Sequence, residues 1–248
     1  MHLETYICEN ETIDDLQYKN LKLIQKKDGF RFGIDAVLLA NFVDVKKGGR
    51  VMDLGTGTGI IAVLLAGKTA AGLIVGLEIQ PEMAEMASRS VKLNNLEERV
   101  KIVNGDIRKA VENFGSSAFD VVLTNPPYMN RGGGLINPSE AKAISRHEIM
   151  CTLEDVVRAG GSLLAPGGQF AMVHRPERFV DAVCLMRTHG IEPKIVRFVH
   201  PSPYKKANLF LIKGARGGKP QLKMLEPLYV HDECGNYSKE INRIYGRE

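Results

Sequence analysis

The stretch Asp53-Leu-Gly-Thr-Gly-Thr-Gly59 places glycine at three alternate positions, directly after the apolar, strand-like residues 50–54. Glycine can adopt positive φ and lets a backbone come close to a ligand. The helix-forming run Ile60–Ala66 follows, so the stretch predicts a strand, a tight turn and a helix. The residues of this turn expected to bind a ligand are Asp53, Gly55, Thr56, Gly57 and Gly59.

Two details of the turn favour S-adenosylmethionine over NAD as that ligand. A dinucleotide-binding turn usually has the pattern Gly-x-Gly-x-x-Gly, whereas the third glycine comes one residue earlier here. Asp53 also stands at the strand end, where it would repel a pyrophosphate and suit a cationic amine. An ordinary glycine turn in an α/β protein is the alternative that this heptapeptide leaves open.

A second stretch, Asn125-Pro-Pro-Tyr128, follows a buried strand predicted for residues 119–124, about seventy residues after the glycine turn. Open α/β sheets bind ligands at the carboxyl ends of their strands. The prolines fix φ and keep Asn125 extended, so its amide oxygen and the Pro126 carbonyl could both accept hydrogen bonds from one amino group. Tyr128 offers a flat face on which a planar substrate could stack.

This arrangement suits methyl transfer to a planar amino group. Such a group is a poor nucleophile because its lone pair is delocalised. Two acceptors aimed at its N–H bonds would favour a pyramidal nitrogen and direct the lone pair at a methyl sulfonium. We therefore predict that the catalytic residues are Asn125, Pro126, Pro127 and Tyr128. The alternative is a Pro-Pro turn that only closes a strand.

Together the two stretches resemble those of class I methyltransferases, in the branch with an Asn-Pro-Pro-Tyr motif that methylates exocyclic or amide nitrogens. The resemblance covers roughly residues 30–215. The segment Phe30–Phe42 is similar to the amino-terminal motif of the bacterial tRNA adenine-N6 methyltransferases that act on a valine tRNA beside its anticodon. In that group the segment covers the cofactor pocket, which implies cofactor contacts for Arg31 and Asp35. Taken alone, the segment predicts a helix that Asp35 caps.

The resemblance also implies roles for two acids at the ends of predicted strands. Glu78 lies about twenty residues after the glycine turn, a spacing at which an acid holds ribose hydroxyls. Asp106 corresponds to an aspartate that, in similar enzymes, accepts a hydrogen bond from the adenine amino group while the next apolar residue packs on the ring. The neighbouring apolar residues here are Ile79 and Ile107. The alternative for each acid is that it caps the helix that follows.

Strand and helix signals alternate regularly from residue 50 onward, as a parallel sheet requires. We predict an α/β, Rossmann-like class I methyltransferase fold: a doubly wound, seven-stranded, mostly parallel sheet with an antiparallel edge strand. The expected strands are 50–54, 73–78, 100–105, 119–124, 168–174, 192–199 and 207–213. One compact unit is expected, with amino-terminal strands and a cofactor-covering helix (1–45), the methyltransferase domain (46–215) and a carboxy-terminal extension packed on it (216–248).

Composition narrows the class of protein further. Hydrophobic residues make up 44% of the 248 residues, enough for a sizeable core, and no apolar run approaches the roughly 18 residues of a membrane-spanning helix. The amino terminus lacks a signal-peptide pattern. The four cysteines are scattered, which suggests neither a disulfide framework nor a zinc site. We expect a cytoplasmic protein with no bound metal, no membrane association and no obligatory protein partner.

Positive charge is concentrated between residues 174 and 219, where ten Lys or Arg stand against three acids. The resulting +7 exceeds the +4 of the whole chain. A basic face beside a pocket for a flat substrate is typical of RNA binding. Clustered Lys and Arg on edge strands also discourage aggregation, which is the alternative. The residues predicted to bind substrate RNA are Lys205, Lys206, Arg216 and Lys219.

Three segments are less informative. The glycine-containing loop 129–139 follows Tyr128 directly, where loops commonly close over substrate, and Gly132–Gly134 suggest disorder without one. Residues 145–148 resemble a stretch of the same tRNA methyltransferase group, although we interpret His147 as structural rather than catalytic. Residues 227–238 resemble the ending of that group.

The leading hypothesis is an S-adenosylmethionine-dependent tRNA adenine-N6 methyltransferase. A protein-glutamine N5-methyltransferase would use the same acceptors, but such enzymes typically carry a helical amino-terminal domain, and only about fifty residues precede the glycine turn. An rRNA guanine-N2 methyltransferase remains open. A DNA adenine methyltransferase usually needs a large target-recognition domain, for which the chain has no room. A non-catalytic RNA-binding module is the alternative from another class.

Overall fold

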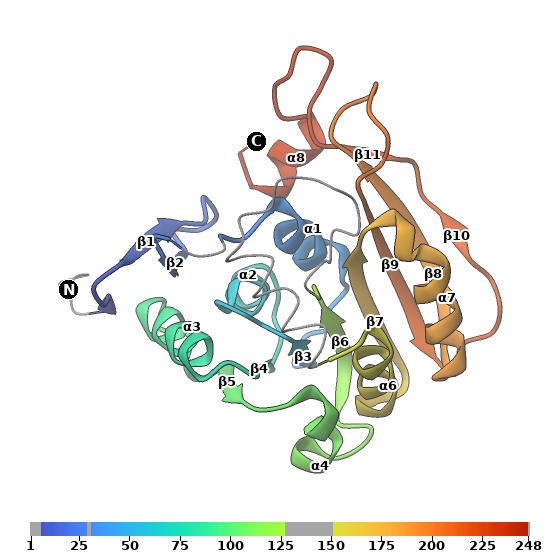
Figure 1. Ribbon diagram of the computed structural model, residues 1–248, viewed down its shortest axis with the longest axis horizontal. Coiled ribbons are helices and arrows are strands. Elements are labelled where there is room, and N and C mark those ends of the chain that lie inside the picture. The colour runs from blue at the N-terminus through green and yellow to red at the C-terminus, as the bar shows by residue number, and fades with distance from the viewer. Residues whose placement is uncertain (1–5, 29–30, 127–150, 248) are drawn as a thin grey trace.

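A central sheet with helices on both faces organises the protein in its computed structural model (Figure 1). The structure describes residues 6–28, 31–126 and 151–247. The strands are β1 Glu11–Asp15, β2 Lys22–Lys26, β3 Arg50–Leu54, β4 Leu73–Glu78, β5 Val100–Asn104, β6 Phe119–Thr124, β7 Leu164–His174, β8 Ile191–His200, β9 Leu209–Arg216, β10 Lys223–Met224 and β11 Leu228–Tyr229. The α-helices are α1 Ile34–Phe42, α2 Ile60–Lys68, α3 Pro81–Leu93, α4 Ala110–Phe114, α6 Leu153–Leu163, α7 Phe179–Thr188 and α8 Lys239–Ile244, with 3-10 turns η2 Ile107–Lys109 and η3 Pro176–Arg178.

Nine of the described strands form the central sheet, in the order β10-β8-β9-β7-β6-β3-β4-β5, with β11 also paired to β8. Every pairing is parallel except those of β9, which is antiparallel to β7 and to β8. The predicted strands correspond to β3 through β9, so the mostly parallel sheet with an antiparallel strand on one side is confirmed. The antiparallel strand lies one place in from β8, and the short β10 and β11 extend the sheet beyond the predicted seven strands.

The two faces of the sheet bury two separate hydrophobic clusters. Val51 and Leu123 belong to the cluster on the side of α1 and α2, whereas Met52 and Val122 belong to the cluster on the side of α6. Adjacent residues therefore point into opposite cores, which explains why parallel strands of this kind are apolar throughout. Residues 60–66 of α2 are all buried, because α1 packs on the outer side of that helix.

The start of β7 differs from the prediction. The segment Leu164–Gly168 has the composition of a loop, with a proline and two glycines, yet it joins the sheet as the first part of the strand. The pairing with β6 changes register between Phe119 and Val121, so the extra residues form a bulge at the sheet margin. Local composition predicts a turn at residues 164–168, and only the pairing with the neighbouring strand β6 makes this segment part of the sheet.

The amino-terminal strands β1 and β2 form a separate antiparallel hairpin that lies against α3. Successive residues of β2 do not alternate between buried and exposed, because Leu23, Ile24 and Gln25 are all buried. Both faces of β2 are covered: the Ile24 backbone N–H donates to Ser90 Oγ of α3 at 3.0 Å, and Gln25 Oε1 accepts from the Phe32 backbone N–H at 3.0 Å.

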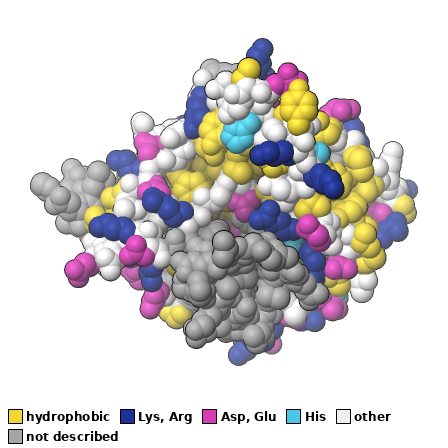
Figure 2. Space-filling model, turned by 45° about the horizontal axis from the view of Figure 1, so that its top comes forward, with side chains coloured by type: hydrophobic (Ala, Val, Ile, Leu, Met, Phe, Trp, Pro, Cys, Tyr) yellow, Lys and Arg dark blue, Asp and Glu magenta, His cyan; other side chains and the backbone are white. Residues whose placement is uncertain are grey.

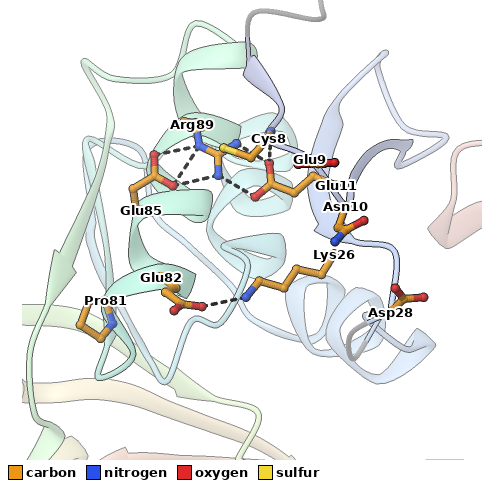
Figure 3. A pocket seen from close by; sticks show the side chains of 10 residues that line it. All are labelled: Cys8, Glu9, Asn10, Glu11, Lys26, Asp28, Pro81, Glu82, Glu85 and Arg89. Carbon is orange, nitrogen blue, oxygen red and sulfur yellow. Dashed lines mark hydrogen bonds and ion pairs between the residues drawn. The ribbon is translucent and has the colours of Figure 1, made fainter.

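A cluster of ion pairs holds the hairpin on α3, beside an open cleft of about 650 Å³ (Figure 3). The Arg89 guanidinium donates to Glu11 on the hairpin at 2.6 and 2.8 Å and to Glu85 on its own helix at 2.8 Å. The hydrogen bond from Arg89 is the main reason that the pKa of Glu11 is lowered. Lys26 reaches Glu82 in the same way at 2.8 Å. Both cations are paired with carboxylates, so we interpret the cleft as a joint between hairpin and helix.

The carboxy-terminal residues share the main core. Ile241 and Ile244 of α8 are buried in the same cluster as α1 and α2, and the Lys68 ammonium donates to the Ile244 carbonyl at 2.6 Å. Arg197 of β8 pairs with Glu240 of α8 at 2.5 Å. No helix among residues 6–28, 31–126 and 151–247 is both long and apolar enough to cross a membrane.

Candidate active site

The glycine turn has the conformation that its sequence predicts. Gly55, Gly57 and Gly59 all have positive φ, at 76°, 57° and 83°. A Cβ atom at Gly59 would lie 3.1 Å from the Ala87 Cβ of α3, so this glycine allows the close packing of two helices. A Cβ at Gly57 would meet nothing within 4 Å, because it would point into open space. The turn thus presents backbone, without side chains, to the space above the sheet.

Asn125 lies beside this turn at the carboxyl edge of the sheet. Leu54 at the end of β3 pairs with Thr124 at the end of β6, and the Thr124 hydroxyl donates to the Leu54 carbonyl at 3.0 Å. Asn125 and Pro126 are half-buried. The predicted residues Pro127, Tyr128 and His147, and the loop 129–139, lie outside the described residues.

The side-chain amide of Asn125 is oriented by a carboxylate from another part of the chain. Asn125 Nδ2 donates to Asp35 Oδ2 at 3.2 Å, and Asp35 is only 9% exposed. Because a carboxylate accepts hydrogen bonds, the group of Asn125 that faces it must be the NH₂ group. The amide oxygen is therefore turned away from Asp35.

Asp35 does not cap α1, which corrects the sequence-based prediction. The residue before the helix is Gly33, and Asp35 is the second helical residue, where its Oδ1 accepts from the Ala36 backbone N–H at 3.0 Å. The helix amino terminus favours a negative charge at this position. A Cβ atom at Gly33 would lie 2.6 Å from Asp35 Oδ1, so Gly33 leaves the room in which the Asp35 carboxylate lies.

A small pocket joins the segment around Gly33, the glycine turn and Asn125. The residues that line it are Phe32, Gly33, Ala36, Gly55, Thr56, Gly57, Thr58, Ile60, Ile61, Met83 and Asn125. The structure therefore brings together three stretches that are far apart in the sequence. Phe32, Gly33 and Ala36 form one wall of the pocket, whereas Arg31 and Asp35, for which the resemblance implied cofactor contacts, are not among its lining residues.

Comparison with known proteins decides the family. Residues 31–189 match the family model described as "Methyltransferase small domain". The chain belongs to this family of methyltransferases. Among curated relatives, a tRNA1(Val) (adenine(37)-N6)-methyltransferase of Porphyromonas gingivalis is 28% identical over 239 residues, which cover 93% of each chain. A protein of the same name from Bacteroides fragilis is 29% identical over 231 residues, or 92% of this chain and 96% of the relative.

Solved structures support the fold of the methyltransferase. A predicted O-methyltransferase of Agrobacterium tumefaciens superposes with a TM-score of 0.70 at 23% identity, covering 86% of this chain and 95% of that one. A geranyl diphosphate methyltransferase solved in complex with S-adenosylmethionine superposes with a TM-score of 0.54 at 13% identity, covering 73% and 84%. At these identities the likeness concerns the fold alone.

Glu78 of the methyltransferase is buried at the end of β4 and faces the glycine turn. Its Oε2 accepts from the Gly57 backbone N–H at 2.9 Å, and its Oε1 accepts from the Gln80 backbone N–H at 2.9 Å. The residue before α3 is Gln80, so Glu78 does not act as the predicted alternative, a cap of that helix. Each carboxylate oxygen has more than one lone pair, so Glu78 retains acceptor capacity for hydroxyl groups.

Asp53 is fully buried beneath the turn. Its Oδ2 accepts from the Thr56 hydroxyl at 2.6 Å, whereas Oδ1 finds no hydrogen-bond partner among the described residues. Burial raises the pKa of Asp53 to about 7, and the charge of Glu78 contributes in the same direction. A Cβ at Gly76 would lie 2.8 Å from Thr56 Oγ1, so glycine in β4 makes room for this contact. Asp53 thus braces the turn from below.

The raised pKa of Asp53 predicts a specific dependence of stability on pH. The folded protein keeps this proton up to about pH 7, whereas the unfolded chain releases it above about pH 4, so Asp53 destabilises the fold increasingly over that interval. Asp53→Asn keeps an acceptor for Thr56 and cannot ionise. We expect the variant to gain about 1–4 kcal/mol relative to the parent between pH 5 and pH 8. Urea unfolding at several pH values measures this, and a constant difference would contradict it.

Asp106 shows the capping interaction that the sequence left as an alternative. Its side chain accepts from the Arg108 backbone N–H at 2.9 Å and also pairs with the Arg108 guanidinium, whose hydrogen bond lowers the pKa of Asp106. Arg31 is exposed and pairs with Asp14 of the hairpin at 2.5 Å. Ile107 is half-buried, with its Cδ1 4.0 Å from the position of a Cβ at Gly55. Ile79 is half-buried beside Glu78.

The four residues predicted to bind RNA fall at opposite ends of the sheet. Lys205 and Lys206 are exposed in the loop after β8, at the carboxyl edge where Asn125 lies. Arg216 ends the antiparallel β9 and therefore lies at the amino edge, where it donates to the Ser117 hydroxyl at 2.7 Å. Lys219 follows at the same edge, and its carbonyl accepts from Lys194. Arg216 and Lys219 therefore lie at the edge of the sheet opposite to the pocket, and their contact with RNA stays a prediction.

Seven of the residues that line the pocket were not among the predicted site residues: Phe32, Gly33, Ala36, Thr58, Ile60, Ile61 and Met83. Phe32 precedes the α1 helix, and Met83 lies in the first turn of α3. A usable signal exists for Met83, because the first turn of a helix that follows a ligand-facing strand end points toward the same edge of the sheet. For Phe32 the signal is the resemblance of segment 30–42 to a motif that covers the cofactor pocket, since residue type and spacing do not show how the segment folds back over the turn.

Proposed function

We propose that this methyltransferase uses S-adenosylmethionine to methylate the exocyclic N6 of an adenine in tRNA. The observation that carries the proposal is the Asn125 amide, which donates to Asp35 and lines one pocket together with Gly55, Thr56 and Gly57 of the glycine turn. The names of relatives that match over more than nine-tenths of their length support adenine 37 of a valine tRNA as the target.

The residues present fit the cofactor. Gly57 leaves open space where a side chain would stand, and Glu78 keeps acceptor capacity for ribose hydroxyls. We assign the adenosyl group to the part of the site beside Glu78 and the glycine turn. Ile79 and Ile107 would be its apolar contacts, and Asp106 would accept from the adenine amino group. When bound, the cofactor supplies a methyl group on a positively charged sulfur.

The protein contributes orientation and polarity. Asp35 accepts from the NH₂ of Asn125, which turns the amide oxygen away from Asp35. We assign this oxygen and the Pro126 carbonyl as the acceptors of the target amino group. Both acceptors draw the amine toward a pyramidal geometry and point its lone pair at the methyl carbon. The amine becomes acidic as it is alkylated, so its proton can pass to water without a strong base. Preorganised groups of this kind typically lower a barrier by several kcal/mol, about a hundredfold or more in rate.

Labelled methyl transfer tests the proposed function directly. The purified protein is incubated with methyl-labelled S-adenosylmethionine and separate fractions of total tRNA, rRNA and protein, followed by nucleoside analysis. We expect label in tRNA as N6-methyladenosine. Label in a glutamine side chain or in guanine N2 would overturn the assignment and favour one of the two alternative amide or amino methyltransferases.

The cofactor pocket is tested by Gly57→Val. The new side chain would occupy the open space beside the turn, so we expect S-adenosylmethionine binding to be lost. Gly48→Val is the matched control, since Gly48 also has positive φ, at 76°, with nothing within 4 Å of its Cβ, but lies in the turn before β3. Both variants carry about 1–2 kcal/mol of backbone strain. Calorimetry that shows equal cofactor affinity for the two variants would contradict this location of the pocket.

A further inference from the structure

The loop 201–208, between β8 and β9, lies at the same edge of the sheet as Asn125. β7 is parallel to β6, and both β7 and β8 are antiparallel to β9, so β6 and β8 end at the same side. Three strand spacings separate them in the order β6-β7-β9-β8. At about 4.8 Å for each step, the start of the loop is roughly 14 Å from the Asn125 position. A single base bound at Asn125 cannot reach it, whereas a few consecutive nucleotides can.

Backbone hydrogen bonds fix the shape of this loop. The Lys205 backbone N–H donates to the Ser202 carbonyl at 3.1 Å, and His200 Nδ1 lies 2.7 Å from the Lys205 carbonyl oxygen. The His231 backbone N–H, from the carboxy-terminal segment, donates to the Pro201 carbonyl at 3.0 Å. Pro201 and Pro203 further restrict φ within the loop. The side chains at its tip are therefore presented by an ordered backbone.

An aromatic ring and two cations stand at the tip of the loop. Tyr204 is 80% exposed, the highest value among the exposed large hydrophobic side chains of the described residues, and Lys205 and Lys206 beside it are also exposed. On the face shown in Figure 2, Lys and Arg side chains stand among hydrophobic ones. A ring left in water gains nothing for the fold. Followed directly by two lysines, such a ring matches a nucleic-acid strand, whose bases stack and whose phosphates are negative.

We propose that Tyr204 stacks on an unpaired nucleotide of the RNA substrate that is not the methylated one, while Lys205 and Lys206 bind the adjoining phosphates. This proposal rests on the proposed function, since it assigns part of the RNA to a surface outside the pocket. The loop then selects RNA whose target adenine lies in a single-stranded segment, because only unpaired neighbours offer a free face to Tyr204. A loop of tRNA satisfies this condition, and a continuous duplex does not.

Substitutions of Tyr204 test the stacking contact. Stacking of one base on an aromatic side chain is typically worth about 1–3 kcal/mol, so Tyr204→Ala should raise the KM for tRNA by about tenfold or more. The kcat and the affinity for S-adenosylmethionine should not change. Tyr204→Phe keeps the ring and should retain the parent KM. A parent-like KM in Tyr204→Ala, or an equal loss in both variants, would overturn the stacking role.

The lysines are tested by charge reversal with a matched control. Lys205→Glu combined with Lys206→Glu should weaken tRNA binding at least tenfold. The slope of log affinity against log salt concentration should also become shallower, by the amount expected for the loss of about two phosphate contacts. Lys46→Glu combined with Lys47→Glu makes the same change in charge at two adjacent exposed lysines before β3, at the amino edge of the sheet. This control should bind tRNA almost like the parent. Equal weakening by both pairs would show a general charge effect and overturn the assignment to the loop.

The outcomes separate this inference from the proposed function. If the parent protein methylates tRNA and Tyr204→Ala does so with unchanged KM, only the stacking surface is wrong. If no RNA accepts a methyl group from the parent protein, the proposed function itself is wrong, whatever the loop variants do.

Discussion

Replacing Asn125 with alanine is expected to lower the rate of methyl transfer by roughly a hundredfold or more, the scale typical for loss of one preorganised polar group at a reacting centre. The substitution removes one of the two proposed acceptors and leaves the glycine turn and Glu78 in place. Cofactor and tRNA affinity should therefore remain close to those of the parent. Single-turnover methyl transfer at saturating tRNA measures the effect. An alanine variant with the parent rate would mean that Asn125 is only a turn residue.

Placing a second carboxylate opposite Asp35, by the substitution Asn125→Asp, is expected to give the second large effect. Asn125→Asp alone places a second carboxylate beside Asp35, where the parent has an amide donor 3.2 Å from Oδ2. Two carboxylates at such a distance cannot both ionise easily, so one must take up a proton or move apart. We expect a loss of at least tenfold in the rate at pH 8, with partial recovery toward pH 6, where a shared proton can restore the contact.

The double variant Asp35→Asn, Asn125→Asp is the matched control for this interpretation. Asparagine at position 35 can donate to aspartate at position 125, so the contact is restored with its direction reversed. We expect the double variant to recover much of the activity that Asn125→Asp loses, and to lose the steep dependence on pH. Purely additive losses in the two single variants and the double variant would show that the two residues act independently.

The conformation and the position of the glycine turn could be predicted from the sequence, because those features depend on local chemistry. Gly55, Gly57 and Gly59 have the positive φ expected of them, and β3, β4 and β6 run over the predicted residues. The predicted class of fold and the methyltransferase family are confirmed by the strand order and by the family model. The predicted domain boundaries remain predictions, and a single core contains residues from all three predicted parts, including Leu23, Leu64 and Ile241.

Contacts between distant segments could not be predicted in the same way. Asp35 and Arg216 illustrate the difference. Aspartate is a residue type that often caps helices, yet the Asp35 side chain instead accepts a hydrogen bond from Asn125, ninety positions away. Arg216 belongs to a basic stretch that also contains Lys205, yet the antiparallel direction of β9 carries it to the other edge of the sheet. In both cases the residue type indicated a polar interaction, but the neighbouring sequence did not indicate where in the fold the side chain lies.

The sequence by itself determined which residues can do the chemistry, since turn conformation, strand ends and acceptor groups follow from residue type and spacing over a few positions. The tertiary structure decided how those residues are held and oriented. Glu78 is bound to the Gly57 amide, Asp53 is buried under Thr56, and Asp35 sets the direction of the Asn125 amide. These contacts depend on the order and direction of strands in the sheet, which bring residues together across long stretches of chain, and local propensities carry no information about them.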